Sequence, residues 1–540
     1  MTGSGLLRTT GPGQVGYAQL SMVDPAGWRA TGVAWAGLVG LAERRSAELV
    51  AGAAQLRSHW SGRAAATAEV RLSELRGELV TLAPAAIEVD QVLAEFAARV
   101  AAARARLAAA VELAATTGVL IDRRGRTSPD PVRLPAGRAD QAVAAVAAGV
   151  RDALDLAAAA DREAAGRLDR LSAAAESGWA TRPPPGRPAA HTDPALVGLW
   201  WRGLTPTERR WLVAYEPELV ARLDGIPVAD RDQANRLLLG ERRAELRERW
   251  GQLLGRVPRG PAELAGLRAV DAALTGLDAL AARLASAEWP RAYLLGLDVA
   301  GEGRAVVALG NPDRAAGTVT YVPGMTAGLD GATDELGRAA RVLSRCAELA
   351  PGQETAAVLW LDYDAPDFLH EAARDGQARA AGEPLHRFQE GLRATHDGPP
   401  ARQTVLGHSY GSLVVGAAAR DHGLAADALV FVGSPGVGVA HASELGVPPE
   451  QVWASTAPDD VIRLTRPPGE LARQAVLGAS PLVTVGELLA GDRDERWFGR
   501  DPTASAFGGR TFPSGRYGHT GYWDPANPAL DGMARVVLGR

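Results

Sequence analysis

The sequence contains no lysine, and all 58 of its basic residues are arginine. A Schiff base with pyridoxal phosphate, a P-loop and the phosphate-binding strand of protein kinases each need a lysine ammonium group, so the absence of lysine excludes these three kinds of site. Cysteine is nearly absent as well. The single cysteine, Cys346, excludes a disulfide within the chain and a cysteine-rich zinc site, and we interpret it as a small core residue.

Strong net charge and long apolar runs are also missing. A net charge of −5 over 540 residues gives no electrostatic basis for binding nucleic acid. No stretch of eighteen apolar residues is free of charge, so we predict no membrane span. The pattern H-E-x-x-H does not occur, since His370-Glu371 lacks the second histidine, and we predict no metal and no cofactor.

The N-terminal residues 1–20 contain no apolar core of signal-peptide length. We predict that they form a flexible leader. The G-x-G-x-x-G match at Gly11–Gly16 follows no strand, so we do not interpret it as a dinucleotide site. We therefore expect either a cytoplasmic location or export by a route that needs no Sec signal peptide.

A G-x-S-x-G pattern occurs at residues 407–411, which read Gly-His-Ser-Tyr-Gly. A short β-prone run precedes it at 403–406, and a small, apolar helical run follows it at 413–420. A serine oxygen can attack a carbonyl only if a sharp strand-to-helix turn presents it, and flanking glycines leave room for that strained backbone. We predict that Ser409 is a nucleophile; the alternative is a buried serine in an ordinary strand–turn–helix.

From about residue 290, short and nearly continuous apolar runs alternate with helical stretches. This alternation predicts a mainly parallel sheet with helices on both faces. The predicted strands are 293–297, 305–308, 318–322, 357–361, 404–406, 428–432 and 452–455, and the predicted helices are 330–349, 371–394 and 410–422.

The region from residue 24 to 180 is predicted to be wholly helical. A first helix covers about 24–59, Trp60-Ser61-Gly62 makes a turn, and a second long helix begins at Arg63. Apolar residues spaced alternately three and four apart form a heptad seam that packs against another helix, and Pro84 is expected to kink or interrupt it. The seam consists of Leu72, Leu75, Leu79, Leu82, Ala86, Val89, Leu93, Phe96 and Val100.

A helix, a Trp-x-Gly turn and a second helix over residues 24–120 resemble the WXG-type substrates of actinobacterial type VII secretion systems. The resemblance rests on Trp60 and Gly62. It implies a helical protein partner, or self-association, through the hairpin and its seam. The export signal of that pathway, a tyrosine followed four positions later by an acidic residue, does not follow the hairpin; Tyr363 and Asp367 have the spacing but lie in the predicted catalytic domain.

A Pro-rich stretch at 181–194 predicts an extended linker with few contacts across it. We therefore expect residues 21–180 to form a helical domain, and residues 195–540 to fold without it. Within 195–540, a helical segment at 195–289 leads into a catalytic domain at 290–540.

Three motifs of this helical segment, together with the serine turn, resemble an actinobacterial branch of the alpha/beta hydrolases. The motifs are Trp-Trp-Arg-Gly-Leu-Thr at 200–205, Leu-Asp-Gly-Ile-Pro at 223–227 and Arg-Asp-Gln-Ala-Asn-Arg at 231–236. The resemblance covers about 200–540. It implies an alpha/beta hydrolase fold, here preceded by a long all-α region.

In alpha/beta hydrolases the catalytic residues follow the chain order serine, acid, histidine. Three histidines come after Ser409. His422 ends the helix after the serine, and His441 precedes any late acidic loop. His519 lies in a glycine-flanked loop before the last helix, where the resembling family also has a His-x-x-Tyr-Trp motif, so we predict that His519 is the general base.

The acid is predicted in the loop directly after the strand at 452–455. From the residues alone, either Asp459 or Asp460 could serve. The resembling family has an Asp-x-Ile sequence at this place, which matches Asp460-Val461-Ile462 and favours Asp460.

A serine hydrolase also needs two backbone N–H groups aimed at the developing oxyanion. We predict that Tyr410 provides one and Met325 the other, because Gly324 lets the loop after the third strand approach closely. For substrate binding we predict residues of the same loops and of the next strand end: Gly324, Trp360, Asp362, Tyr363 and His408.

Two functions are consistent with this sequence. The first is a serine hydrolase that forms an acyl-enzyme with a small acyl substrate, an ester, a thioester or an amide, with esterase- or lipase-like activity favoured. The second is a secretion-associated interaction protein with a vestigial hydrolase domain.

Overall fold

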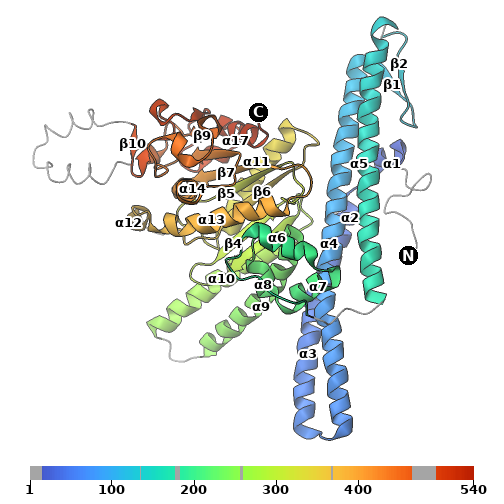
Figure 1. Ribbon diagram of the computed structural model, residues 1–540, viewed down its shortest axis with the longest axis vertical. Helices are drawn as coiled ribbons and strands as arrows, with labels where there is room; N and C mark the ends of the chain where they lie inside the picture. The colour runs from blue at the N-terminus through green and yellow to red at the C-terminus, as the bar shows by residue number, and fades with distance from the viewer. Residues whose placement is uncertain (1–14, 134–135, 177–182, 256–259, 367–368, 465–493) are drawn as a thin grey trace, which may run out of the picture.

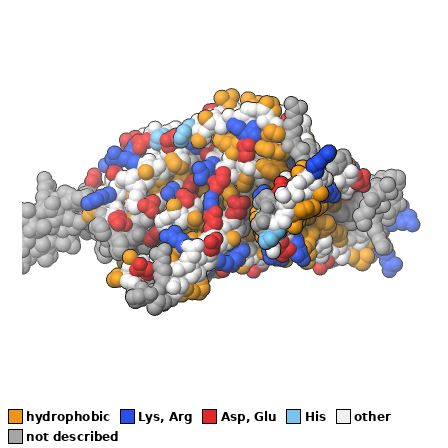
Figure 2. Space-filling view, turned by 90° about the horizontal axis from the view of Figure 1, so that it is seen from below, with side chains coloured by type: hydrophobic (Ala, Val, Ile, Leu, Met, Phe, Trp, Pro, Cys, Tyr) orange, Lys and Arg blue, Asp and Glu red, His pale blue; other side chains and the backbone are white. Residues whose placement is uncertain are grey.

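A computed structural model of the chain describes residues 15–133, 136–176, 183–255, 260–366, 369–464 and 494–540. Figure 1 shows a sheet covered by helices, with a long rod of antiparallel helices along one side. None of the helices in the described part of the chain combines the length and the apolar character that a bilayer-spanning segment requires. On the face drawn in Figure 2, acidic and basic side chains lie interspersed, as the small net charge would suggest.

The central sheet has eight strands in the order β12-β9-β8-β7-β5-β6-β4-β3. The pairs β3–β4 and β4–β6 are antiparallel, and the other pairs are parallel. This confirms the predicted mainly parallel sheet and all seven predicted strands. The strands are β3 (Ala292–Asp298), β4 (Arg304–Leu309), β5 (Gly317–Val322), β6 (Thr355–Leu361), β7 (Arg402–His408), β8 (Ala428–Val432), β9 (Val452–Ser455) and β12 (Arg510–Thr511).

Helices cover both faces of the sheet (Figure 1). Helices α11 (Ala332–Leu349) and α17 (Pro528–Val537) pack against each other on one face, and α13 (Gly376–Thr395) and α14 (Tyr410–His422) pack on the other. Every residue of β5 and β8 is buried. Strands covered on both faces have no polar side to alternate with, which explains the continuous apolar sequence of β8.

The N-terminal region is built around α4 (Arg63–Thr117), a helix of 55 residues. One half of α4 pairs with α5 (Ala136–Glu176) and the other with α3 (Leu38–His59), as Figure 1 shows. Phe96 and Val100 of the seam are buried in a core shared with α5. This part of the seam is therefore covered within the chain, whereas the predicted helical partner and the WXG-like resemblance remain predictions.

The structure corrects three expectations for this region and narrows a fourth. Residues predicted within a flexible leader form α1 (Tyr17–Met22), whose Leu20 is fully buried. The first long helix is divided at Gly37 into α2 (Ala26–Ala36) and α3. Helix α4 is not interrupted at the buried Pro84, one of the two outcomes expected there, because neighbouring helices pack around it. A two-stranded hairpin, β1 (Val119–Ile121) and β2 (Thr127–Pro129), interrupts the predicted all-helical region.

The segment before the sheet forms α6 (Pro194–Gly203), α7 (Pro206–Tyr215), α8 (Pro217–Arg222), α9 (Val228–Gly255) and α10 (Pro261–Ala285). Ala83 and Ile87 of α4 belong to one buried cluster with Val197, Trp201 and Leu212 of this segment. The prediction of few contacts between residues 21–180 and 195–540 is therefore wrong. A proline-rich linker sets the path of the chain, but the apolar face of α4 determines what packs on it.

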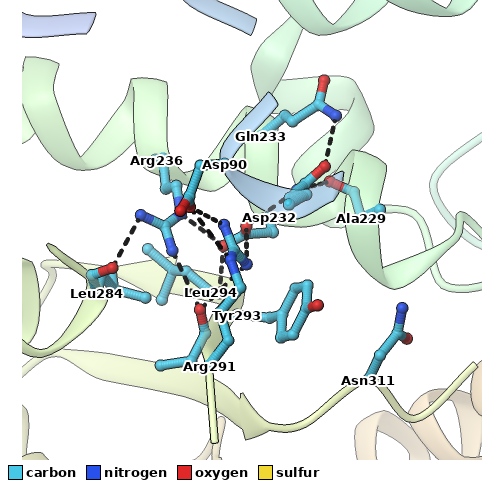
Figure 3. A network of polar contacts seen from close by, with 12 residues as sticks. Asp90, Ala229, Asp232, Gln233, Arg236, Leu284, Arg291, Tyr293, Leu294 and Asn311 are labelled. Atoms are coloured by element: carbon cyan, nitrogen blue, oxygen red, sulfur yellow. Dashed lines mark hydrogen bonds and ion pairs between the residues drawn. The ribbon is translucent and has the colours of Figure 1, made fainter. Parts of the chain in front are cut away.

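A buried network of charges joins the same two parts (Figure 3). Asp90 of α4 accepts hydrogen bonds from Arg29 of α2 at 2.6 Å and from Arg291, directly before β3, also at 2.6 Å. Arg291 in turn contacts Asp232 of α9 at 2.9 Å. The side chains of these four residues are at most 4% exposed. Because each charge is paired, the network avoids the large cost of an isolated buried ion.

Candidate active site

Ser409 lies between β7 and α14, in a backbone conformation that is unusual for a side-chain-bearing residue. Its φ is 53° and its ψ is −127°. Among the described residues, Thr326 is the other non-glycine residue with positive φ. The Ser409 N–H donates to Val432 O of the neighbouring strand at 3.1 Å, and the Ser412 N–H donates to Ser409 O at 3.0 Å. A strained turn of this kind persists only where the surrounding structure enforces it, and it is the geometry of a nucleophile elbow.

The glycines on both sides of Ser409 are required by close backbone contacts. A Cβ at Gly407 would lie 2.6 Å from Ser412 Cα, and a Cβ at Gly411 would lie 2.3 Å from Val322 O. Both distances are far below van der Waals contact. The pattern Gly-x-Ser-x-Gly therefore follows from the packing of β7, α14 and β5 around the turn.

Asp460 and His519 are in contact although they lie 59 positions apart in the sequence. The Nδ1–H of His519 donates to Asp460 Oδ1 at 2.8 Å and lies 3.0 Å from Oδ2. Asp460 is 2% exposed. Burial alone raises the pKa of this carboxyl, but hydrogen bonds from His519 and Tyr522 outweigh it and hold the pKa below the ordinary value. The carboxylate thus fixes the Nδ1–H tautomer of His519, which leaves Nε2 as a proton acceptor.

Asp459, the other candidate acid, lies differently. Its side chain is exposed, and its Oδ1 accepts a hydrogen bond from the Gly518 N–H at 3.1 Å. It therefore contacts the backbone of the histidine loop and not the His519 ring. Of the two adjacent aspartates, Asp460 is the one placed to orient the imidazole.

His408, which precedes Ser409, connects the elbow to the histidine loop. Its Nε2–H donates to the backbone oxygen of His519 at 2.9 Å, and its ring lies 4.9 Å from the His519 ring between centroids. Burial, with His519 nearby, lowers the pKa of His408 to about 3, so the ring is neutral at physiological pH. The side chain of His408 is only 4% exposed and supports the His519 loop, and its predicted contact with substrate remains a prediction.

Ser409 directly follows β7, and the adjacent His408 bonds to the backbone of His519. Ser409 and His519 are both described, and no hydrogen bond joins Ser409 Oγ to the His519 ring. Such bonds are commonly long in ligand-free enzymes. Gly433, at the end of β8 and with a φ of 57°, keeps this space open, since a Cβ there would lie 3.2 Å from His519 Cε1 and 3.0 Å from Asp460 Oδ2.

The loop after β5 passes directly over the serine. A Cβ at Gly324 would lie 2.7 Å from Ser409 Cβ and 3.3 Å from its Oγ. Within the described part of the chain, no hydrogen bond from the backbone N–H of Met325 or Tyr410 is seen, and Tyr410 begins α14, where a helix has no internal acceptor for it. Neither of the two predicted oxyanion donors therefore has a hydrogen-bond partner among the described residues.

The remaining predicted binding residues, those at the end of β6, differ in position. Trp360 is fully buried within the sheet core, and its predicted contact with substrate remains a prediction. Asp362 is exposed. Tyr363 is buried, and its hydroxyl donates to Pro323 O at 2.7 Å, which braces the loop that carries Gly324. Asp367, from the predicted export spacing, lies outside the described residues.

Sequence reasoning did not identify Tyr522. Its hydroxyl donates to Asp460 Oδ2 at 2.5 Å, and the side chain is fully buried. Tyr522 is the tyrosine of the His-x-x-Tyr-Trp motif, so the motif itself pointed to this residue. Among the described residues, no group of three or more histidine, cysteine, aspartate or glutamate side chains could hold a metal ion.

Comparison with known proteins places the chain among mycobacterial relatives. Residues 298–470 match the family model described as alpha/beta hydrolase. The uncharacterized protein Rv2079 of Mycobacterium tuberculosis is 30% identical over 383 residues, 66% of this chain and 56% of that protein, so the chain spans little more than half of that relative's length. The uncharacterized protein Rv0963c of the same organism is 34% identical over 200 residues, 35% of this chain and 75% of that protein.

Among solved structures, the esterase PE8 is 16% identical, with a TM-score of 0.27 over 43% of this chain and 96% of its own. The sheet order, the serine turn and the family model identify the fold. The chain belongs to the same family as these mycobacterial proteins, and its C-terminal region is an alpha/beta hydrolase domain.

Proposed function

We propose that this protein is a serine hydrolase that cleaves an ester by acyl transfer. One observation carries the proposal. Ser409 lies in a strained strand-to-helix turn, and the adjacent His408 bonds to the backbone of His519. The Nδ1–H of His519 is held by the buried carboxylate of Asp460, in the chain order Ser409, Asp460, His519. A nucleophile, a base and an orienting acid in this arrangement form the constellation that activates a serine.

In this mechanism Ser409 Oγ attacks the carbonyl carbon of the substrate while His519 Nε2 takes the hydroxyl proton. Asp460 keeps the imidazole oriented and stabilises the imidazolium that forms. The imidazolium then gives its proton to the leaving alcohol as the carbon–oxygen bond breaks. A water molecule attacks the acyl-enzyme with His519 as base again, which releases the acid and restores the serine.

The negative charge on the tetrahedral intermediate needs donors that are already in place. We assign this role to the backbone N–H groups of Tyr410 and Met325. The close approach of Gly324 to Ser409, together with the Tyr363 brace, supports this assignment. Removing one such donor typically costs on the order of a hundredfold or more in kcat.

A panel of p-nitrophenyl esters of graded acyl length, assayed with the wild type and Ser409→Ala, tests this proposal. The elbow glycines accommodate the strain, so alanine should leave the fold intact, as circular dichroism can verify. We expect turnover in the wild type and loss of at least about a thousandfold in Ser409→Ala. Equal turnover in both folded proteins would remove Ser409 from the mechanism.

A further inference from the structure

The hydroxyl of Tyr522 bridges two parts of the acid loop. It donates to Asp460 Oδ2 at 2.5 Å and accepts a hydrogen bond from the Ala457 N–H at 2.9 Å. Ala457 follows β9, so the hydroxyl connects the end of that strand with the carboxylate three residues later. The side chain is fully buried, and no solvent can replace the hydroxyl if it is lost.

The Asp460 carboxyl group accepts hydrogen bonds from three donors, which indicates its protonation state. The Ile462 N–H and His519 Nδ1–H bond to Oδ1 at 2.8 Å each, and the Tyr522 hydroxyl bonds to Oδ2. A carboxyl group that only accepts hydrogen bonds is ionised. Burial and the adjacent carboxylate raise the pKa of Tyr522 above its ordinary value, so its hydroxyl keeps the proton that it donates.

The base and this tyrosine come from one short segment. Residues Gly521–Trp523 form a 3₁₀ turn that begins two residues after His519. His519 and Tyr522 are three residues apart in the sequence, and both donate to the one carboxylate. The ring of Tyr522 also packs edge-on against His408, at 6.1 Å between centroids. The segment is therefore attached to Asp460 at two points.

We propose that Tyr522 is a positioning residue of the active site, which holds Asp460 in the rotamer that orients the His519 imidazole. This inference rests on the proposed function. With the hydroxyl bound to Oδ2, rotation of the carboxylate about its Cβ–Cγ bond would break the Ala457–Tyr522–Asp460 chain of hydrogen bonds. Without it, the carboxylate is held by Ile462 and His519 alone and can turn away from the base.

The variant Tyr522→Phe tests this, because it removes one oxygen atom and keeps the ring. Tyr517→Phe is a matched control in the same loop, since Tyr517 is 39% exposed. We expect kcat of Tyr522→Phe to fall about tenfold to a hundredfold with KM changed less than about twofold, the loss typical of a hydrogen bond to a charged group. Tyr517→Phe should match the wild type.

If the role of Tyr522 were purely structural, Tyr522→Phe would not shift the pH dependence of kcat/KM, and its effect would not depend on Asp460. Loss of the donor leaves more negative charge facing the imidazolium, so the acid limb of the kcat/KM profile should move to higher pH. In an Asp460→Asn background, Tyr522→Phe should add almost nothing. An unchanged kcat in Tyr522→Phe, full additivity with Asp460→Asn, or failure of the variant to fold by circular dichroism would each overturn the positioning role.

A spectroscopic readout separates this inference from the proposed function. In protein labelled with ¹⁵N-histidine, the His519 Nδ1–H should give a downfield proton signal. Faster exchange with water should broaden it in Tyr522→Phe and not in Tyr517→Phe. If Ser409→Ala hydrolyses esters as well as the wild type, the proposed function fails and this signal alone decides the role of Tyr522; an identical signal in both tyrosine variants overturns it.

Discussion

The carboxylate of Asp90 and the guanidinium of Arg291 lie 2.6 Å apart, although 201 residues separate them in the sequence. Asp90 belongs to the long helix α4, and Arg291 immediately precedes β3 at the edge of the hydrolase sheet. Burial by itself lowers the pKa of Arg291, but the attraction of Asp90 and Asp232 reverses this effect, so that the pKa is raised overall. The N-terminal helices and the hydrolase domain are therefore connected through a buried charge pair.

Asp90→Asn should destabilise the whole chain. The substitution leaves Arg29 and Arg291 buried without their anionic partner, and breaking such a pair typically costs about 3–5 kcal/mol. Glu74→Gln on the same helix is the control, because its ion pair with Arg71 is exposed and worth less than about 1 kcal/mol. Urea denaturation measures both values. A cost below about 1 kcal/mol for Asp90→Asn would mean that the network contributes little to stability.

This pair also marks a limit of what the sequence predicts. The proline-rich linker predicted two separable parts, and the charges of Asp90 and Arg291 gave no indication that they are buried. Local patterns record which residues share a helix face, but a contact between residues 201 positions apart depends on how finished elements pack. The same limit applies to Pro84, where packing keeps the helix continuous against its local preference.

Asp460→Asn should lower kcat about a hundredfold or more, and Asp459→Asn should stay within a few-fold. The buried Asp460 carboxylate holds the His519 Nδ1–H, whereas the exposed Asp459 accepts one backbone hydrogen bond from Gly518. The kcat values of both variants on one ester decide the matter. The reverse pattern would assign Asp459, and two mild effects would place the acid elsewhere.

Gly324→Ala should impair catalysis without unfolding the protein. The new methyl group would lie 2.7 Å from Ser409 Cβ, so the loop or the serine has to move. A displacement near the reacting atoms can cost about a hundredfold in rate. The control is Gly337→Ala in α11, because a Cβ at this position meets nothing within 4 Å. This substitution should slightly stabilise the helix. Full activity of Gly324→Ala would place the oxyanion loop farther from the serine than we infer.

The serine turn could be predicted from local sequence, whereas the role of Tyr522 could not. The strained conformation of Ser409 requires glycines at fixed offsets, so the sequence records the geometry directly. The role of Tyr522 depends on a carboxylate 62 positions away in the sequence. His408 illustrates the same difference, since its hydrogen bond to the backbone of His519 depends on a residue 111 positions away in the sequence.

His408 should make the fold sensitive to mild acid. Its pKa is lowered from the ordinary 6.5 to about 3, so below pH 6.5 the unfolded chain binds a proton that the folded chain rejects. Stability from this group is present above about pH 6.5 and is lost progressively as the pH falls toward 3. Between pH 7 and pH 5 the loss should be about 2 kcal/mol.

His408→Gln keeps a side-chain N–H donor but cannot titrate. Between pH 7 and pH 5 the variant should therefore lose about 2 kcal/mol less unfolding free energy than the wild type. His191→Gln, at an exposed position, should behave like the wild type. Denaturation curves at the two pH values provide the comparison. Identical pH dependence in His408→Gln and the wild type would contradict a buried, neutral His408.

The claim that Ser409 is an activated nucleophile is tested most directly by covalent labelling. The full-length wild type and Ser409→Ala are incubated with a fluorophosphonate, and the adduct is located by peptide mass spectrometry. We predict one adduct per chain in the wild type, on Ser409, formed more slowly in Asp460→Asn and absent in Ser409→Ala. No adduct on a folded wild-type protein, or the same labelling in Ser409→Ala, would contradict it.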